Sequence, residues 1–317
     1  MRVKTSADNI NKSKEKKGAS LRSVLHNENT VGYVFISLFI IGFLVFTVYP
    51  LLSSLYFSFT KYSGLGTPEW IGLLNYKRMF TLDPRYIKSL KVTFVYVFIY
   101  VPLRLIFALL IAMMFKSGGR IIAAYRTIYY LPSVIGGSVA VAVIWRQLWG
   151  YGGVINRLFI NLGLMEEEFS FIASKDTALM TIIILAIWQF GSPMLVFLAG
   201  LKDIPVSLYE AAIVDGANSW QKFWRITLPC LTPIIFFNLV NQLISGFMAF
   251  TQAFIITRGG PNDATMLYVV YLYEKSFTTF QMGYGSAMAW VLIVIVAILT
   301  AILFATQGKW VYYENKG

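Results

Sequence analysis

The stretch EAAIVDGANSWQKFWRITLP, residues Glu210–Pro229, is a polar segment between two long apolar runs of the chain. Its first residues are typical of a short amphipathic helix. Gly216 then interrupts the helical pattern, because glycine permits the positive backbone angle with which a chain reverses. A second short helix follows and leads into the next apolar run. The turn chemistry therefore predicts a helix, a glycine hinge and a second helix.

The rest of the chain is strongly apolar. It has 317 residues, of which 57% are hydrophobic and 13% charged, and its mean hydropathy is +0.64. So few charged residues cannot make the surface of a chain of this size soluble in water. The bilayer is therefore the solvent for most of the chain. Six runs reach the roughly 20 apolar residues that a membrane-spanning helix needs. They are Tyr33–Phe57, Val92–Phe115, Thr127–Trp149, Ala178–Leu201, Ile234–Ile256 and Ser286–Ala305. The sequence predicts an all-α membrane protein with six transmembrane helices.

The distribution of Lys and Arg predicts the orientation. If the N-terminus is cytoplasmic, the inner segments hold 15 Lys and Arg and the outer segments hold 9, which is the bias expected of cytoplasmic loops. Both termini are therefore predicted inside, and Glu210–Pro229 faces the cytoplasm. The predicted divisions are a basic tail at 1–31, which contacts anionic lipid, a transmembrane domain at 32–306 containing the loop 207–229, and a short tail at 307–317. The first apolar run has the length of an uncleaved anchor rather than a removable signal.

Several classes of function are excluded. No Gly-x-x-x-x-Gly-Lys-Ser/Thr segment exists, so the chain has no phosphate-binding loop with which to hydrolyse ATP. One cysteine, Cys230, and one histidine, His26, provide neither a disulfide, a His-based triad nor a multi-His metal site. The formal charge of +12 lies between apolar spans rather than on one soluble face, which argues against a nucleic-acid partner. The sequence predicts a conduit without a catalytic residue.

Polar residues follow one face of the fifth predicted span. Asn238, Asn241, Gln242 and Ser245 are spaced by three, four and three residues, and Ala249 and Gln252 continue the stripe. Amides at membrane depth are unfavourable against lipid, so this face must contact protein or water. Two interpretations stay open, namely a path for a neutral polyol and hydrogen bonding between packed helices.

Other residues inside the spans are candidates for the same path. Trp188 and Gln189 flank a predicted bend before Pro193, and an aromatic ring beside an amide suits a sugar, with core packing as the alternative. Arg104 lies in the second span, where it either serves a functional site, bonds to carbonyls at a kink near Pro102, or contacts a sister subunit. Arg104 and Arg146 favour an anionic solute if they face a cavity. The prolines inside or at the ends of the spans predict bent helices around a cavity; they are residues 50, 102, 132 and 193.

Several motifs together resemble the carbohydrate branch of the permease subunits of ATP-binding-cassette (ABC) importers, the relatives of the larger maltose-transport membrane subunit. The Glu210–Pro229 stretch resembles the EAA loop of that family, with Glu-Ala-Ala, Asp-Gly-Ala and Ile-x-Leu-Pro in place. Further resemblances lie at Tyr49–Thr60, Trp70–Tyr76, Arg126–Pro132 and Gly259–Pro261, with Thr265, Tyr271–Tyr273 and Phe277. They cover nearly the whole chain from about residue 30. Arg258 departs from the small or amide residue common before the Gly-Gly-Pro.

The resemblance implies a type I importer permease in the plasma membrane of a prokaryote. It implies that the loop is the helix that couples the permease to an ATPase, through Glu210, Ala211, Ala212, Asp215 and Gly216. The implied partners are a second, similar permease forming a heterodimer, a dimer of ATP-binding subunits that hold ATP and Mg²⁺, an extracellular solute-binding protein, and a sugar or oligosaccharide. The permease itself is expected to bind no cofactor. An alternative is a carrier driven by an ion gradient, which would be expected to contain carboxylates within the membrane and related halves.

Overall fold

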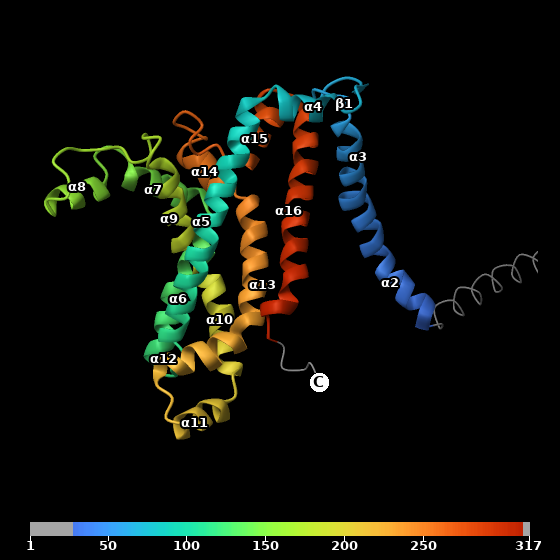
Figure 1. The fold of residues 1–317 in the computed structure, drawn as a ribbon. Helices are drawn as coiled ribbons and strands as arrows, with labels where there is room; N and C mark the ends of the chain where they lie inside the picture. The colour runs from blue at the N-terminus through green and yellow to red at the C-terminus, as the bar shows by residue number, and fades with distance from the viewer. Residues whose placement is uncertain (1–27, 313–317) are drawn as a thin grey trace, which may run out of the picture. The chain divides into compact units, whose positions relative to one another are not determined.

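The computed structural model describes residues 28–312, and these are largely helical (Figure 1). The predicted tail at 1–31 falls almost entirely outside this range. The N-terminal unit is one continuous helical rod made of α2 (Glu28–Phe43), a π-helical turn η1 (Leu44–Val48) and α3 (Tyr49–Ser58). Phe39 and Phe43, one turn apart, stack with ring centroids 6.3 Å apart. Within this rod Phe35–Ser58 is long and apolar enough to cross a bilayer, which matches the first predicted span.

The second unit, Ser58–Gly317, holds the remaining elements. Its first half comprises β1 (Thr60–Lys61), β2 (Glu69–Trp70), α4 (Leu74–Thr81), α5 (Pro84–Met114), α6 (Arg120–Ile135), α7 (Val139–Trp149), α8 (Val154–Asn161) and α9 (Ala178–Trp188). Its second half comprises α10 (Gly191–Asp203), α11 (Val206–Val214), α12 (Ser219–Lys222), η2 (Phe223–Thr227), α13 (Leu228–Phe247), α14 (Thr251–Ile256), α15 (Tyr268–Tyr273), η3 (Glu274–Thr278) and α16 (Met282–Trp310). α16 thus runs beyond the predicted boundary at residue 306.

Six spans are present if bent pairs are counted as one span each. In the described part of the chain, single helices of sufficient length and apolarity cover Phe35–Ser58, Pro84–Met114, Ser219–Ile256 and Met282–Trp310. Two bent pairs meet the same criterion when each is taken as one span. The first pairs α6 with the segment of α7 and α8 and is bent by 96°, and the second pairs α9 with α10 and is bent by 41°. The all-α class and the number of predicted spans agree with this architecture.

The third predicted span, Thr127–Trp149, is wrong as a straight helix. The chain ends α6 at Ile135, turns at Gly136 and starts α7 at Val139. Ser138 explains the new start, because its hydroxyl accepts a hydrogen bond from the amide of Val141 at 3.3 Å and so caps α7. A hydropathy window averages over such a turn, since both sides of it are apolar.

α5 is the central helix of the second unit and contacts α9, α10, α13 and α15. It starts well, because Pro84 occupies the first turn and the carboxylate of Asp83 accepts from the amide of Tyr86 at 3.1 Å. α5 and α13 approach closely at Gly246, where an added Cβ would lie 2.7 Å from Cε1 of Tyr100. The main hydrophobic core surrounds this axis.

The two ends of the second unit differ in construction. At one end α11 and α12 lie beyond the last turns of α5 and α16 (Figure 1). At the other end short elements cover the helices. There β1 pairs with β2 in antiparallel register, with Thr60 opposite Trp70, and the buried amide of Asn75 donates to the carbonyls of Ser58 and Thr60, both at 2.9 Å. The segments 60–90 and 257–285 are therefore ordered structure rather than slack loops.

Candidate functional site

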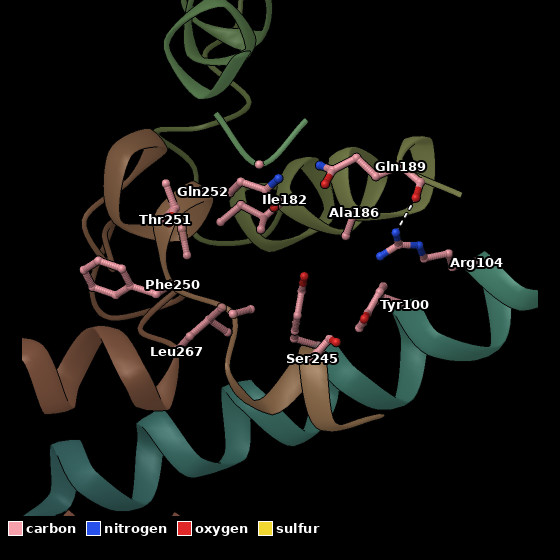
Figure 2. A pocket seen from close by; sticks show the side chains of 14 residues that line it. Tyr100, Arg104, Ile182, Ala186, Gln189, Ser245, Phe250, Thr251, Gln252 and Leu267 are labelled. Carbon is pink, nitrogen blue, oxygen red and sulfur yellow. Dashed lines mark hydrogen bonds between the residues drawn. The ribbon is translucent and has the colours of Figure 1, made fainter. Parts of the chain in front are cut away.

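A polar cavity of about 210 Å³ lies between α5, the α9–α10 break, and the end of α13 with α14. Figure 2 shows Gln189 and Gln252 on one side of it and Tyr100 and Ser245 on the other. Fourteen residues line it, namely Tyr96, Tyr100, Arg104, Gly137, Ile182, Ala186, Gln189, Ser245, Ala249, Phe250, Thr251, Gln252, Ala253 and Leu267. Of the predicted path residues, Gln189 and Ser245 are among them, as is Gln252, which continues the stripe of Ser245.

One stripe of α5 supplies an aromatic and cationic wall. Tyr96, Tyr100 and Arg104 are four residues apart, which places them above one another on the same helix face. The rings of Tyr96 and Tyr100 stack at 5.0 Å and 20°, and the guanidinium of Arg104 lies 5.9 Å from the Tyr100 ring. The hydroxyl of Tyr100 donates to the carbonyl of Gln242 at 3.0 Å, so this wall is fixed to α13.

Arg104 is anchored at a helix break. Its Nη2 donates to the main-chain carbonyl of Gln189, as the dashed line in Figure 2 marks. In a continuous helix that carbonyl would accept from residue 193, which is a proline and has no N–H. The kink that Arg104 satisfies is therefore the one before Pro193 and not one near Pro102, which lies inside the continuous helix α5.

Ser133 completes the bonding at the same break. Its hydroxyl donates to the Gln189 carbonyl at 2.8 Å and accepts from the amide of Ser192 at 3.0 Å. Its helix α6 packs close to α10, since a Cβ added at Gly191 would meet Cα of Tyr130 at 2.7 Å. Neighbouring helices thus satisfy the backbone groups that the break frees, as membrane proteins require.

The other predicted path residues have different surroundings. Gln252 donates from its amide to the carbonyl of Gly136 at 2.8 Å, across the α6–α7 break, so it both lines the cavity and bonds two helices. Gln242 accepts from Tyr100 through its side-chain oxygen at 3.3 Å. Asn241 donates to Phe237 of its own helix at 2.8 Å. Asn238 is buried, 3% exposed, and its amide nitrogen has no partner among the described residues. None of the last three lines the cavity.

Tryptophan 188 also stands apart from the cavity lining. Its ring lies 6.2 Å from that of Trp145, and the residue is 37% exposed. Arg146 is exposed on α7 and borders a different surface pocket with Tyr151 and Ser170. Tyr96, Tyr100, Phe250 and Thr251 line the cavity but were not among the sequence candidates. The spacing of Tyr96 and Tyr100, eight and four residues before Arg104, was the available signal for two of them.

The 210–229 segment has the predicted helix, hinge and helix, with an earlier start. α11 begins at Val206, so Glu210, Ala211 and Ala212 lie inside it rather than opening it. It ends in a Schellman motif, with the amide of Ala217 bonded to the carbonyl of Ala212 at 2.8 Å and that of Gly216 to Ile213 at 3.0 Å. Gly216 has φ +74°, the left-handed angle that glycine adopts without strain.

A reciprocal capping box then starts the next helix. The side chain of Asn218 accepts from the Gln221 amide at 2.8 Å, and the Gln221 side chain accepts from the Asn218 amide at 2.9 Å. From Ser219 the chain continues through the π-helical turn η2 into α13. The hinge at Gly216 is therefore connected by continuous helix to the wall of the cavity.

The outer surface of α11 is apolar and uncovered. Ile213 is 60% and Val214 87% exposed, and Val206 and Leu208 are exposed beside them. One side of the helix is tied down, since the hydroxyls of Tyr209 and Thr227 lie 2.9 Å apart and Nζ of Lys116 lies 4.3 Å from the Tyr209 ring. An apolar helix face held rigidly in this way is suited to insertion into a groove of another protein.

A charged network occupies the opposite end of the unit. Arg85 donates through Nε and Nη2 to both carboxylate oxygens of Asp263, at 3.0 and 2.9 Å, and through Nη1 to Glu274 at 2.7 Å. The guanidinium hydrogen bonds hold the pKa of Asp263 below its usual value. This fork fastens the loop of the Gly-Gly-Pro sequence to the start of α5.

Asp83 forms a second part of that network. Its carboxylate accepts from the hydroxyls of Tyr271 and Tyr284, each at 2.7 Å. Burial by itself raises the pKa of Asp83, but these hydrogen bonds outweigh burial and lower it. The pKa of Tyr271 is raised, by burial first and by its bond to Asp83 second. Within residues 28–312 no three His, Cys, Asp or Glu side chains are grouped as metal ligands.

Comparison with known proteins agrees with this architecture. The family described as "Binding-protein-dependent transport system inner membrane component" matches residues 84–308. The probable ABC transporter permease protein YesP of Bacillus subtilis (strain 168) is 56% identical, over 95% of this chain and 96% of its own length. The multiple sugar-binding transport system permease protein MsmF of Streptococcus mutans is 30% identical, over 88% of this chain and 95% of its own.

A solved structure has the same fold. It is a bacterial ABC transporter involved in the import of the acidic polysaccharide alginate, one chain of which superimposes with a TM-score of 0.79, covering 92% of this chain and 99% of its own at 23% identity. At that identity the match shows the type I importer permease fold alone. The family match extends from the first turn of α5 to the last turn of α16. The chain therefore belongs to the family of binding-protein-dependent transport system inner membrane components, the permease subunits of ABC importers, and is a multi-pass membrane protein.

Proposed function

We propose that this permease forms one half of the path for a sugar or oligosaccharide, and that α11 receives the energy of ATP from a separate subunit. The observation that carries the proposal is the helical connection between α11 and the polar cavity. The exposed apolar helix α11 is followed by the Gly216 hinge and then by helix that continues to α13, whose end lines the polar cavity. A movement of α11 is thereby passed to the cavity without crossing a flexible loop.

The exposed residues of α11 support the proposal that an ATPase binds there. Glu210, Ala211 and Ala212 lie within this helix, and Asp215 and Gly216 form its end. Val214 and Ile213 supply apolar area that a groove would cover, while Glu210 remains exposed for an arginine of the partner. ATP and Mg²⁺ are bound by that partner, because the permease sequence contains no phosphate-binding loop.

The cavity supports a polar, hydroxyl-rich solute. Gln189, Ser245 and Gln252 offer neutral donors and acceptors around a space walled by tyrosine rings. Related proteins include a permease named for multiple sugar binding. In this proposal the path is completed by a second, similar permease, and an extracellular binding protein delivers the solute; the family's description as a binding-protein-dependent transport system supports the latter. Asn238, Asn241, Gln242 and Trp188 lie outside this cavity, so any part they take in the path belongs to another of its stages.

The test is uptake by proteoliposomes that contain the complete complex with its binding protein. Labelled oligosaccharides would be offered with ATP inside the vesicles, with ATP replaced by a non-hydrolysable analogue, and with a proton or sodium gradient alone. The proposal predicts accumulation only in the first case. Accumulation driven by the ion gradient without ATP would contradict it and would favour a secondary carrier.

A further inference from the structure

The cavity has a permanent positive charge and no negative one. Among the fourteen described residues that line it, Arg104 is the only one with a charged side chain. The helices α5, α9, α13 and α14 that build its walls contain no Asp or Glu. Arginine stays protonated in proteins, so this charge persists at every physiological pH. A neutral solute would leave it facing only a carbonyl and aromatic rings.

Arg104 also has unused hydrogen-bonding capacity. The guanidinium has five N–H donors, and the bond from Nη2 to the Gln189 carbonyl occupies one of its nitrogens. Nε is buried and has no partner among the described residues. A charge-assisted bond to an anion is stronger than a bond to a neutral acceptor, and planar carboxylates match the guanidinium fork.

We propose that the solute carried through this cavity is an acidic sugar, and that Arg104 is the specificity-determining residue that binds its carboxylate. The inference rests on the proposed function and names the chemical class of its substrate. One cation balances one negative charge, which suits a uronate residue. A phosphate dianion would bring a second negative charge into a cavity that holds no second cation.

The neutral lining residues fit the rest of a uronate ring. The stacked rings of Tyr96 and Tyr100 provide an apolar wall for the C–H face of a sugar, and Gln189, Ser245 and Thr251 supply partners for its hydroxyls. The volume of about 210 Å³ is below the roughly 300–1,000 Å³ of sites for drug-sized ligands. The cavity therefore takes one ring of an oligosaccharide at a time.

The experiment measures binding to the whole membrane complex in nanodiscs, without its binding protein, by equilibrium dialysis. The probes are a labelled uronate disaccharide and the neutral disaccharide made by reducing its carboxylates to hydroxymethyl groups. The wild type is expected to bind the acidic probe at least tenfold more tightly. Arg104→Gln should reduce that ratio to within twofold, and Arg104→Lys should keep part of it. Arg146→Gln, a change of the same kind at an exposed position outside the cavity, should leave the ratio unchanged.

Equal binding of the two probes by the wild type, or binding of neither, overturns the inference. This result does not need a variant, so it stands even if Arg104→Gln fails to fold. The inference is also overturned if Arg104→Gln keeps the tenfold ratio, or if it releases the second permease on size exclusion, since Arg104 would then be a subunit contact. ATP-driven uptake of sugars by the same complex tests the proposed function separately. If the complex takes up sugars without preferring acidic ones, only this inference is refuted. If it takes up no sugar with ATP, the proposed function is refuted.

Discussion

Arg104 on α5 donates to the carbonyl of Gln189, which loses its helical partner because Pro193 has no N–H. One residue thus satisfies a helix break and charges the cavity beside it. A similar arrangement occurs at the other break, where Gln252 donates to the carbonyl of Gly136 at 2.8 Å. The bends beside the cavity are held by side chains that line it.

Ser133→Ala should lower the thermal stability of the purified complex. The substitution removes one of the two donors to the Gln189 carbonyl, the other being Arg104, and the acceptor for the Ser192 amide, and each hydrogen bond lost costs about 0.5–1.5 kcal/mol. Pro193→Ala restores an N–H near the same carbonyl. In that background Ser133→Ala should therefore cost less, as a double-mutant cycle by thermal unfolding would show. Equal costs in the two backgrounds would mean that Pro193 is not the reason why this carbonyl takes its hydrogen bonds from side chains.

Gly246→Ala should destabilise the contact between α5 and α13. The new Cβ would lie 2.7 Å from Cε1 of Tyr100 and 3.1 Å from Cγ2 of Val97, so the helices must separate, at a cost of about 1–3 kcal/mol. Gly308→Ala is the matched control on α16, because nothing lies within 4 Å of its Cβ position. It should be neutral or stabilising by up to about 1 kcal/mol. The melting temperatures of the two variants decide the matter, and a shift of equal size in both would contradict this packing.

The Arg85–Asp263 fork should contribute stability that depends on pH. The pKa of Asp263 is lowered in the folded protein from its ordinary value of 3.8. Its contribution is therefore complete above the unfolded pKa and is lost as pH falls through the lower, folded pKa. Asp263→Asn should cost about 1–2 kcal/mol near neutral pH, at the lower end for charged hydrogen bonds because Arg85 is 40% exposed.

Melting temperatures of wild type and Asp263→Asn between pH 7 and pH 3 check that expectation. The difference between them should be constant near neutrality and should shrink once the pH is below about 4. Asn is a suitable replacement, because Asp263 has φ +57° and Asn tolerates this region nearly as well. A difference that persists unchanged at pH 3 would show that the carboxylate charge is not what holds the loop.

Local chemistry predicted the 210–229 segment better than any other part of the chain. Glycine, Asn218 and the helix formers around them specify their own conformations, and the structure contains that hinge and both helices. The start of α11 was missed because Pro205, at its N-cap, has no capping side chain to mark it. Hydropathy also located the spans but not the 96° turn after Ile135, since apolar residues on both sides conceal a change of direction.

The candidate path was predicted only in part. Helical spacing correctly placed Ser245 and Gln252 on the cavity side, and it put Asn238 and Asn241 in the same stripe although neither lines the cavity. Spacing tells which residues share a face, but the neighbouring helix decides what covers that face. For the same reason the sequence could not show that Arg104 meets Gln189, which is 85 residues away along the chain.

In the proposed function the Gly216 hinge couples ATP hydrolysis to transport. At φ +74° a β-branched residue is strained, whereas Asn adopts this region readily. No atom lies within 4 Å of the Cβ position, so Gly216→Val and Gly216→Asn differ chiefly in backbone strain. The strain of the valine variant is about 1–2 kcal/mol, which is enough to displace α11 without unfolding the spans.

The most direct measurement is the ratio of sugar molecules taken up to ATP molecules hydrolysed by proteoliposomes containing wild type, Gly216→Val or Gly216→Asn complexes. We expect the valine variant to assemble but to lose most of its sugar uptake per ATP, while the asparagine variant stays close to wild type. Equal ratios in all three complexes would contradict the claim that this hinge transmits the energy of ATP to the cavity.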